Sequence, residues 1–247
     1  MAGSWQGRKR QKKWNLMESI FFILLVLVAG YILLRSPVFE VHRVLVRGNQ
    51  FLSGDTIRSV ADISTGVNIF KLDLAAPAAN LKMIPMIKEA QVARSLPATV
   101  VITVQERRPL ALLPNGEGFV EVDAEGVYLQ KAGAGVPGLP VITGVQGDIP
   151  GPGQVIRAER LGDALAVISG LPGEVVAGLS EVHVAGDGRV RLYTLDGIQC
   201  RFGLPTEIRE KGAVFSQLLA ELRKQGARVE YIDLSSAGQP VVLYKNR

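Results

Sequence analysis

Histidine and cysteine are scarce in this sequence of 247 residues, which contains two histidines and one cysteine. Cys200 has no second cysteine to pair with, so any exported part of the chain must be stabilised by packing without internal disulfides. His42 and His183 are too few to form a histidine-based metal cluster, and they leave little material for a serine triad. We expect Cys200 to be a buried core thiol and both histidines to be partly exposed strand residues.

Phosphate-binding loops are lacking as well. No Walker motif occurs in the chain, and the glycines of segment 133–138 match only the spacing of a dinucleotide fingerprint. Pro137 and Pro140 forbid the helix that would have to begin there, so this segment is predicted to be a loop. Turn or strand-end roles suffice for three acidic residues: Asp123, Glu125 and Asp233. The sequence therefore predicts no enzyme, no metal site and no cofactor.

The net charge of +5 is not spread along the chain. Residues 1–15 contain five basic and no acidic side chains, which leaves 23 basic and 23 acidic residues in the rest. A nucleic-acid-binding surface would need an excess of basic residues in the folded part, and this part has none. The five basic residues are Arg8, Lys9, Arg10, Lys12 and Lys13.

One long hydrophobic run occurs, at residues 16–34, interrupted only by Glu18. A helix over this run is long enough to cross a bilayer once Trp14 is placed at the interface, and the basic residues before it predict a cytoplasmic N-terminus. Residues from 38 onward would then be extracytoplasmic. A cleaved signal peptide is the alternative, but the apolar run continues beyond its candidate cleavage site at 28–30, and no A-x-A pattern follows.

The first exported segment, 38–107, predicts the order strand, helix, helix, strand, strand. Phe39 and Val41 alternate on one strand face, and the next apolar residues have the opposite parity, so a bulge near His42 is expected. Ser53 offers a cap for a first short helix. The other predicted elements are a helix over 72–81 and strands over 88–94 and 98–106.

The remaining segment, 109–247, predicts short strands separated by glycine turns. Hairpin signals occur at Asn115-Gly116, Asp187-Gly188 and Asp196-Gly197, and another hairpin is expected around 123–125. Two helices are predicted, over 157–169 and over 206–225, the second capped by Thr206 and ended by Gly226. Two final strands, 229–234 and 240–244, end the chain. The fold class is therefore α+β: one apolar helix, a β-α-α-β-β domain and a β-rich domain with two helices.

Ordered motifs in the first exported segment carry a resemblance to a known family. These are FEV at 39–41, VLVRGN at 44–49, GVNIFKLD at 66–73, IKEAQVARSLPATVVI at 87–102 and ERRP at 106–109. Together, behind one N-terminal anchor, they closely resemble the POTRA domain of the FtsQ/DivIB family of bacterial cell-division proteins. Looser motifs resemble the second domain of that family: FVEVDAEG at 119–126, LPVITG at 139–144 and YIDL at 231–234.

The resemblance implies a single-pass type II protein of the cell (inner) membrane at the division septum. It implies a cytoplasmic tail at 1–15, a transmembrane helix at 16–34, a POTRA domain at 38–107 and a β-rich domain at 109–247. Such a protein scaffolds other division proteins without enzymatic activity. The implied partners are the small coiled-coil proteins of the FtsB/DivIC and FtsL type, the septal peptidoglycan synthase complex and the cytoplasmic membrane, with no nucleic acid.

Two other classes remain open at this stage. POTRA units also occur in protein export and outer-membrane assembly systems, but there they precede a membrane β-barrel, and here the second half contains helices. A membrane-tethered cell-wall enzyme would need a convergent polar cluster, which the sequence does not provide.

The C-terminal strand is the candidate binding site. Pro240 lacks the amide that a central strand needs, so the last strand is expected at a sheet edge, where backbone groups remain free for an added strand. The family resemblance indicates the same region as the partner site. The alternative is that the strand merely completes the core. The candidate partner-binding residues are Tyr231, Leu234, Ser235, Ser236, Pro240, Val241, Val242, Leu243 and Tyr244.

Overall fold

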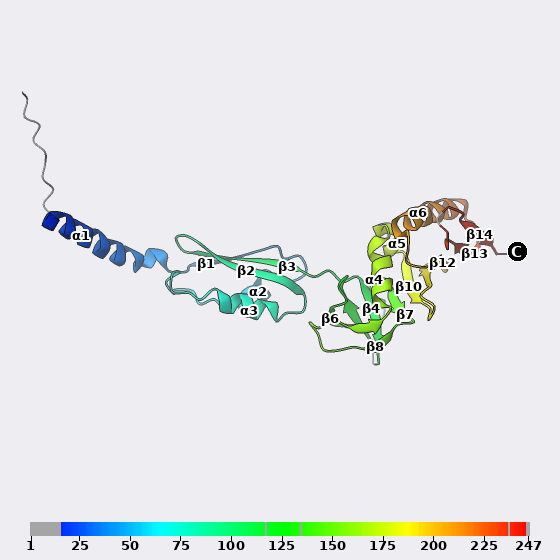
Figure 1. The fold of residues 1–247 in the computed structure, drawn as a ribbon, viewed down its shortest axis with the longest axis horizontal. Coiled ribbons are helices and arrows are strands. Elements are labelled where there is room, and N and C mark those ends of the chain that lie inside the picture. Colours follow the sequence, from blue (N-terminus) through cyan, green and yellow to red (C-terminus); the bar gives the residue numbers. More distant parts are fainter. Residues whose placement is uncertain (1–15, 117, 134, 237, 246–247) are drawn as a thin grey trace, which may run out of the picture.

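A computed structural model describes residues 16–116, 118–133, 135–236 and 238–245 of the chain (Figure 1). The predicted basic tail at 1–15, with Trp14, lies outside the described residues. The first element, α1 (Leu16–Leu34), covers the apolar run, and its window Met17–Leu34 is not buried against the rest of the protein. A helix of 19 residues is about 28 Å long, which approaches the thickness of a hydrocarbon core.

The next unit has the predicted β-α-α-β-β order. Its three-stranded sheet has the order β1-β3-β2, with β1 parallel to β3 and β2 antiparallel to it. Alternate residues of β3 point into the core, because Val100, Ile102 and Val104 are all buried. The elements are β1 (Arg43–Arg47), α2 (Gly54–Ala61), α3 (Ala75–Lys82), β2 (Ile87–Ser95) and β3 (Thr99–Glu106).

Two details of this unit depend on local hydrogen bonds. Ser53 caps α2 as predicted, since its hydroxyl accepts the Thr56 N–H at 3.0 Å. The prediction that Phe39 lies in a strand is wrong: Pro37–Phe39 form a short 3₁₀ helix (η1). Pro37 fixes the backbone angle for that turn, and the strand begins only at Arg43.

The second unit is built on a sheet of nine strands within the described residues. Their order is β14-β13-β12-β11-β10-β7-β4-β5-β6, so β14 and β6 are the two edges. A separate ribbon pairs β8 with β9. The strands are β4 (Ala111–Asn115), β5 (Gly118–Val122), β6 (Tyr128–Ala132), β7 (Val141–Thr143), β8 (Gln146–Asp148), β9 (Arg157–Glu159), β10 (Leu179–Val184), β11 (Val190–Thr194), β12 (Gln199–Gly203), β13 (Val229–Asp233) and β14 (Val241–Tyr244).

This unit contains three helices in the described residues rather than the predicted two: α4 (Leu161–Gly170), α5 (Gly173–Ala177) and α6 (Ile208–Gln225). The prediction of helix over 157–169 is wrong at its start, because Arg157–Glu159 pair with β8 instead. Thr206 is not the cap of α6; that position belongs to Glu207, in a left-handed conformation without a side-chain cap. Gly226 ends α6 as predicted, with φ of 61°.

The core of the second unit lies between the sheet and its helices. Cys200 is buried there, as predicted, and burial raises the pKa of its thiol. Lys211 of α6 is also buried, at 1% exposure. Its ammonium group donates hydrogen bonds to the carbonyls of Phe202 and Leu204, at 3.2 and 3.1 Å, so its polar end is satisfied within the core. This contact fixes the connection from β12 to α6.

Candidate functional site

The C-terminal strand β14 is an edge of the nine-stranded sheet, with β13 on one side and no described strand on the other. It runs antiparallel to β13, and Leu243 lies opposite Tyr231. The prediction of an edge position for this strand is therefore confirmed. Its length of four residues and the exposed Pro240 before it are typical of edge strands.

The backbone direction along β14 follows from two hydrogen bonds. Lys245 donates its N–H to the Arg228 carbonyl at 2.9 Å, so the odd-numbered residues of β14 face β13. Leu234 donates its N–H to the Arg201 carbonyl of β12 at 2.9 Å, so the even-numbered residues of β13 direct their N–H and C=O groups toward β12. The odd-numbered residues of β13 therefore face β14, where Tyr231 and Asp233 lie opposite odd-numbered residues of that strand. Val242 and Tyr244 consequently direct their N–H and C=O groups away from the sheet, where an added strand would bind them.

The side chains of β14 divide between the core and the solvent. Val242 packs against the core of the second unit, whereas Val241, Leu243 and Tyr244 are 56%, 41% and 53% exposed. An edge strand that exposes three apolar side chains offers pockets or contacts for the side chains of an added strand. The strand therefore contacts the core through Val242 and leaves its other three side chains exposed.

The other predicted residues surround the end of β13. Tyr231 is half-buried, and the Arg201 guanidinium lies 3.7 Å from its ring centroid, which holds the ring on the outer face of the sheet. Leu234 is fully buried, so its side chain is not available to a partner. Ser235 and Ser236 are exposed in the turn that leads toward β14.

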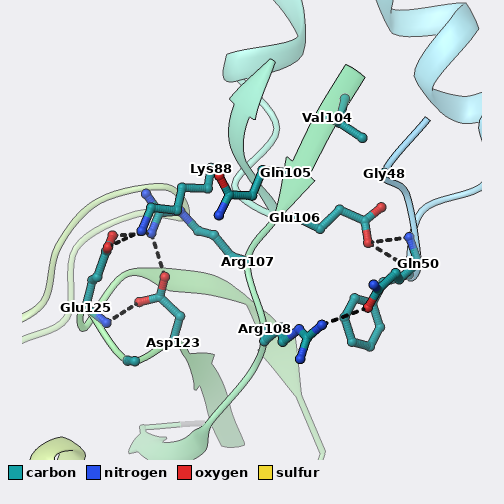
Figure 2. Close-up of a pocket in the computed structure, with 12 residues that line it drawn as sticks. Gly48, Gln50, Lys88, Val104, Gln105, Glu106, Arg107, Arg108, Asp123 and Glu125 are labelled. Carbon is teal, nitrogen blue, oxygen red and sulfur yellow. Dashed lines mark hydrogen bonds and ion pairs between the residues drawn. The ribbon is translucent and has the colours of Figure 1, made fainter. Parts of the chain in front are cut away.

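A polar site that no sequence pattern predicts joins the two units (Figure 2). Arg107 follows β3 and donates hydrogen bonds to Asp123 at 2.6 Å and to Glu125 at 2.7 Å, both in the turn between β5 and β6. Lys88 of β2 also pairs with Glu125. Asp123 has the predicted turn role too, because it accepts the N–H groups of Glu125 and Val127 at 2.9 Å.

These ion pairs lie beside an open cavity of about 410 Å³ and an apolar contact. On the far side of the cavity, the Glu106 carboxylate accepts the N–H groups of residues 50–52 at 2.6 to 3.0 Å. Met86 of the first unit packs with Val127 and Leu129 of the second. The junction is therefore held by both charge and packing, and four of its charged groups form ion pairs with one another: Lys88, Arg107, Asp123 and Glu125.

The comparisons with known proteins agree on one family. The family model described as Cell division protein FtsQ/DivIB, C-terminal, matches residues 111–235, and the model POTRA domain, FtsQ-type, matches residues 39–107. The chain belongs to the FtsQ/DivIB family. This membership makes it a cell-division protein and confirms the predicted fold class, with a POTRA domain before a β-rich domain.

Curated relatives named Cell division protein FtsQ match most of the chain. The protein from Anaeromyxobacter sp. (strain K) is 30% identical over 215 residues, which cover 83% of this chain and 71% of that protein. The protein from Streptomyces griseus is 31% identical, covering 82% of this chain and 96% of that protein. The protein from Syntrophotalea carbinolica is 27% identical over 93% of this chain and 83% of its own length.

The match to the FtsQ/DivIB C-terminal model ends at residue 235. It includes Tyr231 and Ser235 and stops before β14, so binding by the edge strand stays a prediction. The junction residues Lys88 and Arg107 lie inside the POTRA match, and Asp123 and Glu125 lie inside the C-terminal match. The sequence contained all four in its family motifs, but nothing in it paired them across the two domains.

The ion pairs at the junction hold the pKa of Glu125 below the ordinary value of a glutamate carboxyl group. Hydrogen bonds from Lys88 and Arg107 lower its pKa from 4.5 to about 2. Because the folded-state pKa is below the ordinary value, the contribution of Glu125 to the junction is complete above about pH 4.5 and is lost as the pH falls through about 2.

A carbon-detected NMR titration of the Glu125 carboxyl group in the full chain measures this value. In the Lys88→Met variant we expect the pKa to move back toward its ordinary value, since Lys88 is the largest cause of the shift. A wild-type titration near pH 4.5 would show that the ion pairs do not form in solution.

Proposed function

We propose that the protein is a single-pass scaffold of the divisome, anchored in the cell membrane at the division septum, without enzymatic activity. Residues 1–15 form the cytoplasmic tail, residues 16–34 cross the membrane, and the POTRA domain (38–107) and β-rich domain (109–247) are extracytoplasmic. The edge strand β14 binds an extended segment of a partner of the FtsB/DivIC type. A partner of the FtsL type and the septal peptidoglycan synthase complex join the same assembly.

The observation that carries this proposal is the free edge of β14 in a protein of the FtsQ/DivIB family. Strand addition needs outward-facing backbone groups and adjacent apolar side chains, and Val242, Tyr244 and Leu243 provide them. The surroundings of the two histidines are also compatible with a scaffold role. His42 is exposed. His183 is half-buried and lies 2.8 Å from the Thr143 hydroxyl, but that hydroxyl donates its one proton to Glu181, so the imidazole has no hydroxyl proton to accept there.

Capture from membranes tests the partner assignment. We expect the full chain, co-expressed with tagged FtsB/DivIC-type and FtsL-type proteins, to co-purify with both after mild detergent extraction. A chain that ends at Gln239 lacks β14 and should be extracted normally but recover little of either partner. Equal recovery by both chains would contradict binding at this edge.

Thiol labelling in intact cells tests the topology. A cysteine introduced at Leu195, which is 71% exposed in the β-rich domain, should react with an impermeant reagent, and one at Ser4 should not. The unmodified chain is the matched control, because the buried Cys200 should not react. Labelling at Ser4 without labelling at Leu195 would reverse the orientation.

A further inference from the structure

The connection between α1 and the POTRA domain is short and is held by a hydrogen bond. Asn68 donates a side-chain hydrogen bond to the carbonyl of Leu34, the last residue of α1, at 2.7 Å. Val41 is already fully buried in the domain, only seven residues after α1 ends. The loop that contains Asn68 therefore lies at the level where the helix ends.

The end of α1 has the side chains of a membrane interface. Arg35 follows the helix, and its guanidinium lies 4.6 Å from the centre of the Tyr31 ring. Tyrosine and arginine pairs of this kind occur where a span leaves the hydrocarbon and enters the headgroups. The headgroup layer is roughly 5 to 8 Å thick on each side, so a side chain in contact with Leu34 lies within it or beside it.

Exposed apolar side chains gather at this end of the POTRA domain. Four of them form what we call the proximal patch, with exposures of 57%, 36%, 43% and 59%: Val38, Val67, Phe70 and Leu96. An exposed patch of this kind marks an interaction surface when something on the molecule indicates what covers it.

The segments that carry the proximal patch are bonded to one another. Val41 donates to the Val67 carbonyl at 2.9 Å, and the rings of Phe39 and Phe70 are 5.3 Å apart. Arg94, beside the β2–β3 turn that holds Leu96, donates to the Ile69 carbonyl at 2.7 Å. Figure 1 shows this turn at the end of the domain that faces α1.

The charges around the proximal patch suit phospholipid headgroups. Arg35, Arg43 and Lys71 are exposed, and no ion pair is formed by any of them within the described residues. Basic side chains next to apolar ones are the pattern by which a protein binds an interface, with the apolar groups among the acyl boundary and the cations on the phosphates.

We propose that the proximal patch is a second membrane contact, through which the POTRA domain rests on the phospholipid surface beside its own anchor. The proposal rests on the proposed membrane span. The occupant is the lipid surface because the hydrogen bond from Asn68 to Leu34 holds the patch at the height where the span ends. Insertion of the four apolar side chains limits the swivel of the exported region about residues 35–37.

A depth measurement on the full chain tests this contact. The chain is reconstituted into vesicles of phosphatidylethanolamine and phosphatidylglycerol, with a nitroxide on Ser95→Cys, an exposed position next to Leu96 that leaves the patch intact. The buried Cys200 stays unlabelled. Collision of the nitroxide with oxygen, relative to a water-soluble nickel chelate, reports its proximity to lipid.

The matched position is Met83→Cys, which is 81% exposed and separated from Ser95 by the length of β2. We expect the oxygen-to-nickel ratio at Ser95 to be about three times that at Met83, and to fall to the Met83 value when Phe70→Ser and Leu96→Ser are added. Equal ratios at the two positions, in a chain that floats with the vesicles, would overturn the contact and leave the span intact. A chain that does not float would overturn the span itself and this contact with it.

Discussion

Replacing Val242 by proline should abolish partner binding and leave the β-rich domain folded. The Val242 N–H points away from β13, so proline removes a donor that only an added strand would use, and its ring blocks close approach along the edge. The loss of one ladder hydrogen bond and the steric block should weaken binding at least tenfold, or about 1.4 kcal/mol. Binding of the partner to the full chain in detergent, by calorimetry or biolayer interferometry, measures this change.

Two controls separate the free edge from the packing of β14. Val242→Ala truncates the side chain that contacts the core but keeps the N–H, so it should bind the partner with little change. Leu243→Pro removes an N–H that faces β13, and we expect it to loosen β14 itself, seen as faster amide exchange in β13. Wild-type affinity in Val242→Pro would exclude strand addition at this edge.

Substituting Gly48 by alanine should destabilise the POTRA domain severely. Gly48 has φ of 84°, and a Cβ atom there would lie 2.1 Å from the Val104 carbonyl oxygen of β3. The new methyl group must push apart the backbone at the end of β1, in addition to the strain of a positive φ. The expected loss is about 4 kcal/mol, of the size seen when a substitution forces the backbone to move.

Gly66→Ala is the matched control for Gly48→Ala. Gly66 has nearly the same φ, 79°, but nothing lies within 4 Å of its would-be Cβ. It should therefore show only the conformational strain, about 1 kcal/mol. Hydrogen exchange of the β3 amides in the full chain measures the opening free energy of this domain for both variants. If both variants lose the same opening free energy, the contact with Val104 is not the reason that position 48 requires glycine.

The fold was predictable wherever side-chain periodicity and local caps decide the structure. Val100, Ile102 and Val104 alternate because one face of β3 covers a core, and Ser53 marks the start of α2 because its hydroxyl accepts an N–H of the first turn. The errors occur where pairing between distant segments decides instead. The sequence of residues 157–159 predicts the first turn of a helix, but these residues form strand β9 because they pair with β8.

The same distinction applies to the sites. The edge position of β14 could be predicted because Pro240 lacks an amide, which is a property of one residue. The pairing of Lys88 with Glu125 spans 37 positions and joins two domains, and no local pattern signals it. The bond between Asn68 and Leu34 is hidden for the same reason, since either residue alone has an ordinary role as a turn or a helix end.

In the proposed assembly, a partner of β14 must reach from the membrane to the far end of the chain. Figure 1 shows α1 and β14 at opposite ends of the molecule, with the POTRA domain and the body of the β-rich domain between them. The stalk of a partner anchored in the same membrane must span the distance from the end of α1 to β14 before the partner can pair with the edge. A helix rises about 1.5 Å per residue and a strand about 3.3 Å, so a helical stalk needs roughly twice as many residues as an extended one. In the proposed assembly, the two folded domains thus select partners by stalk length as well as by sequence.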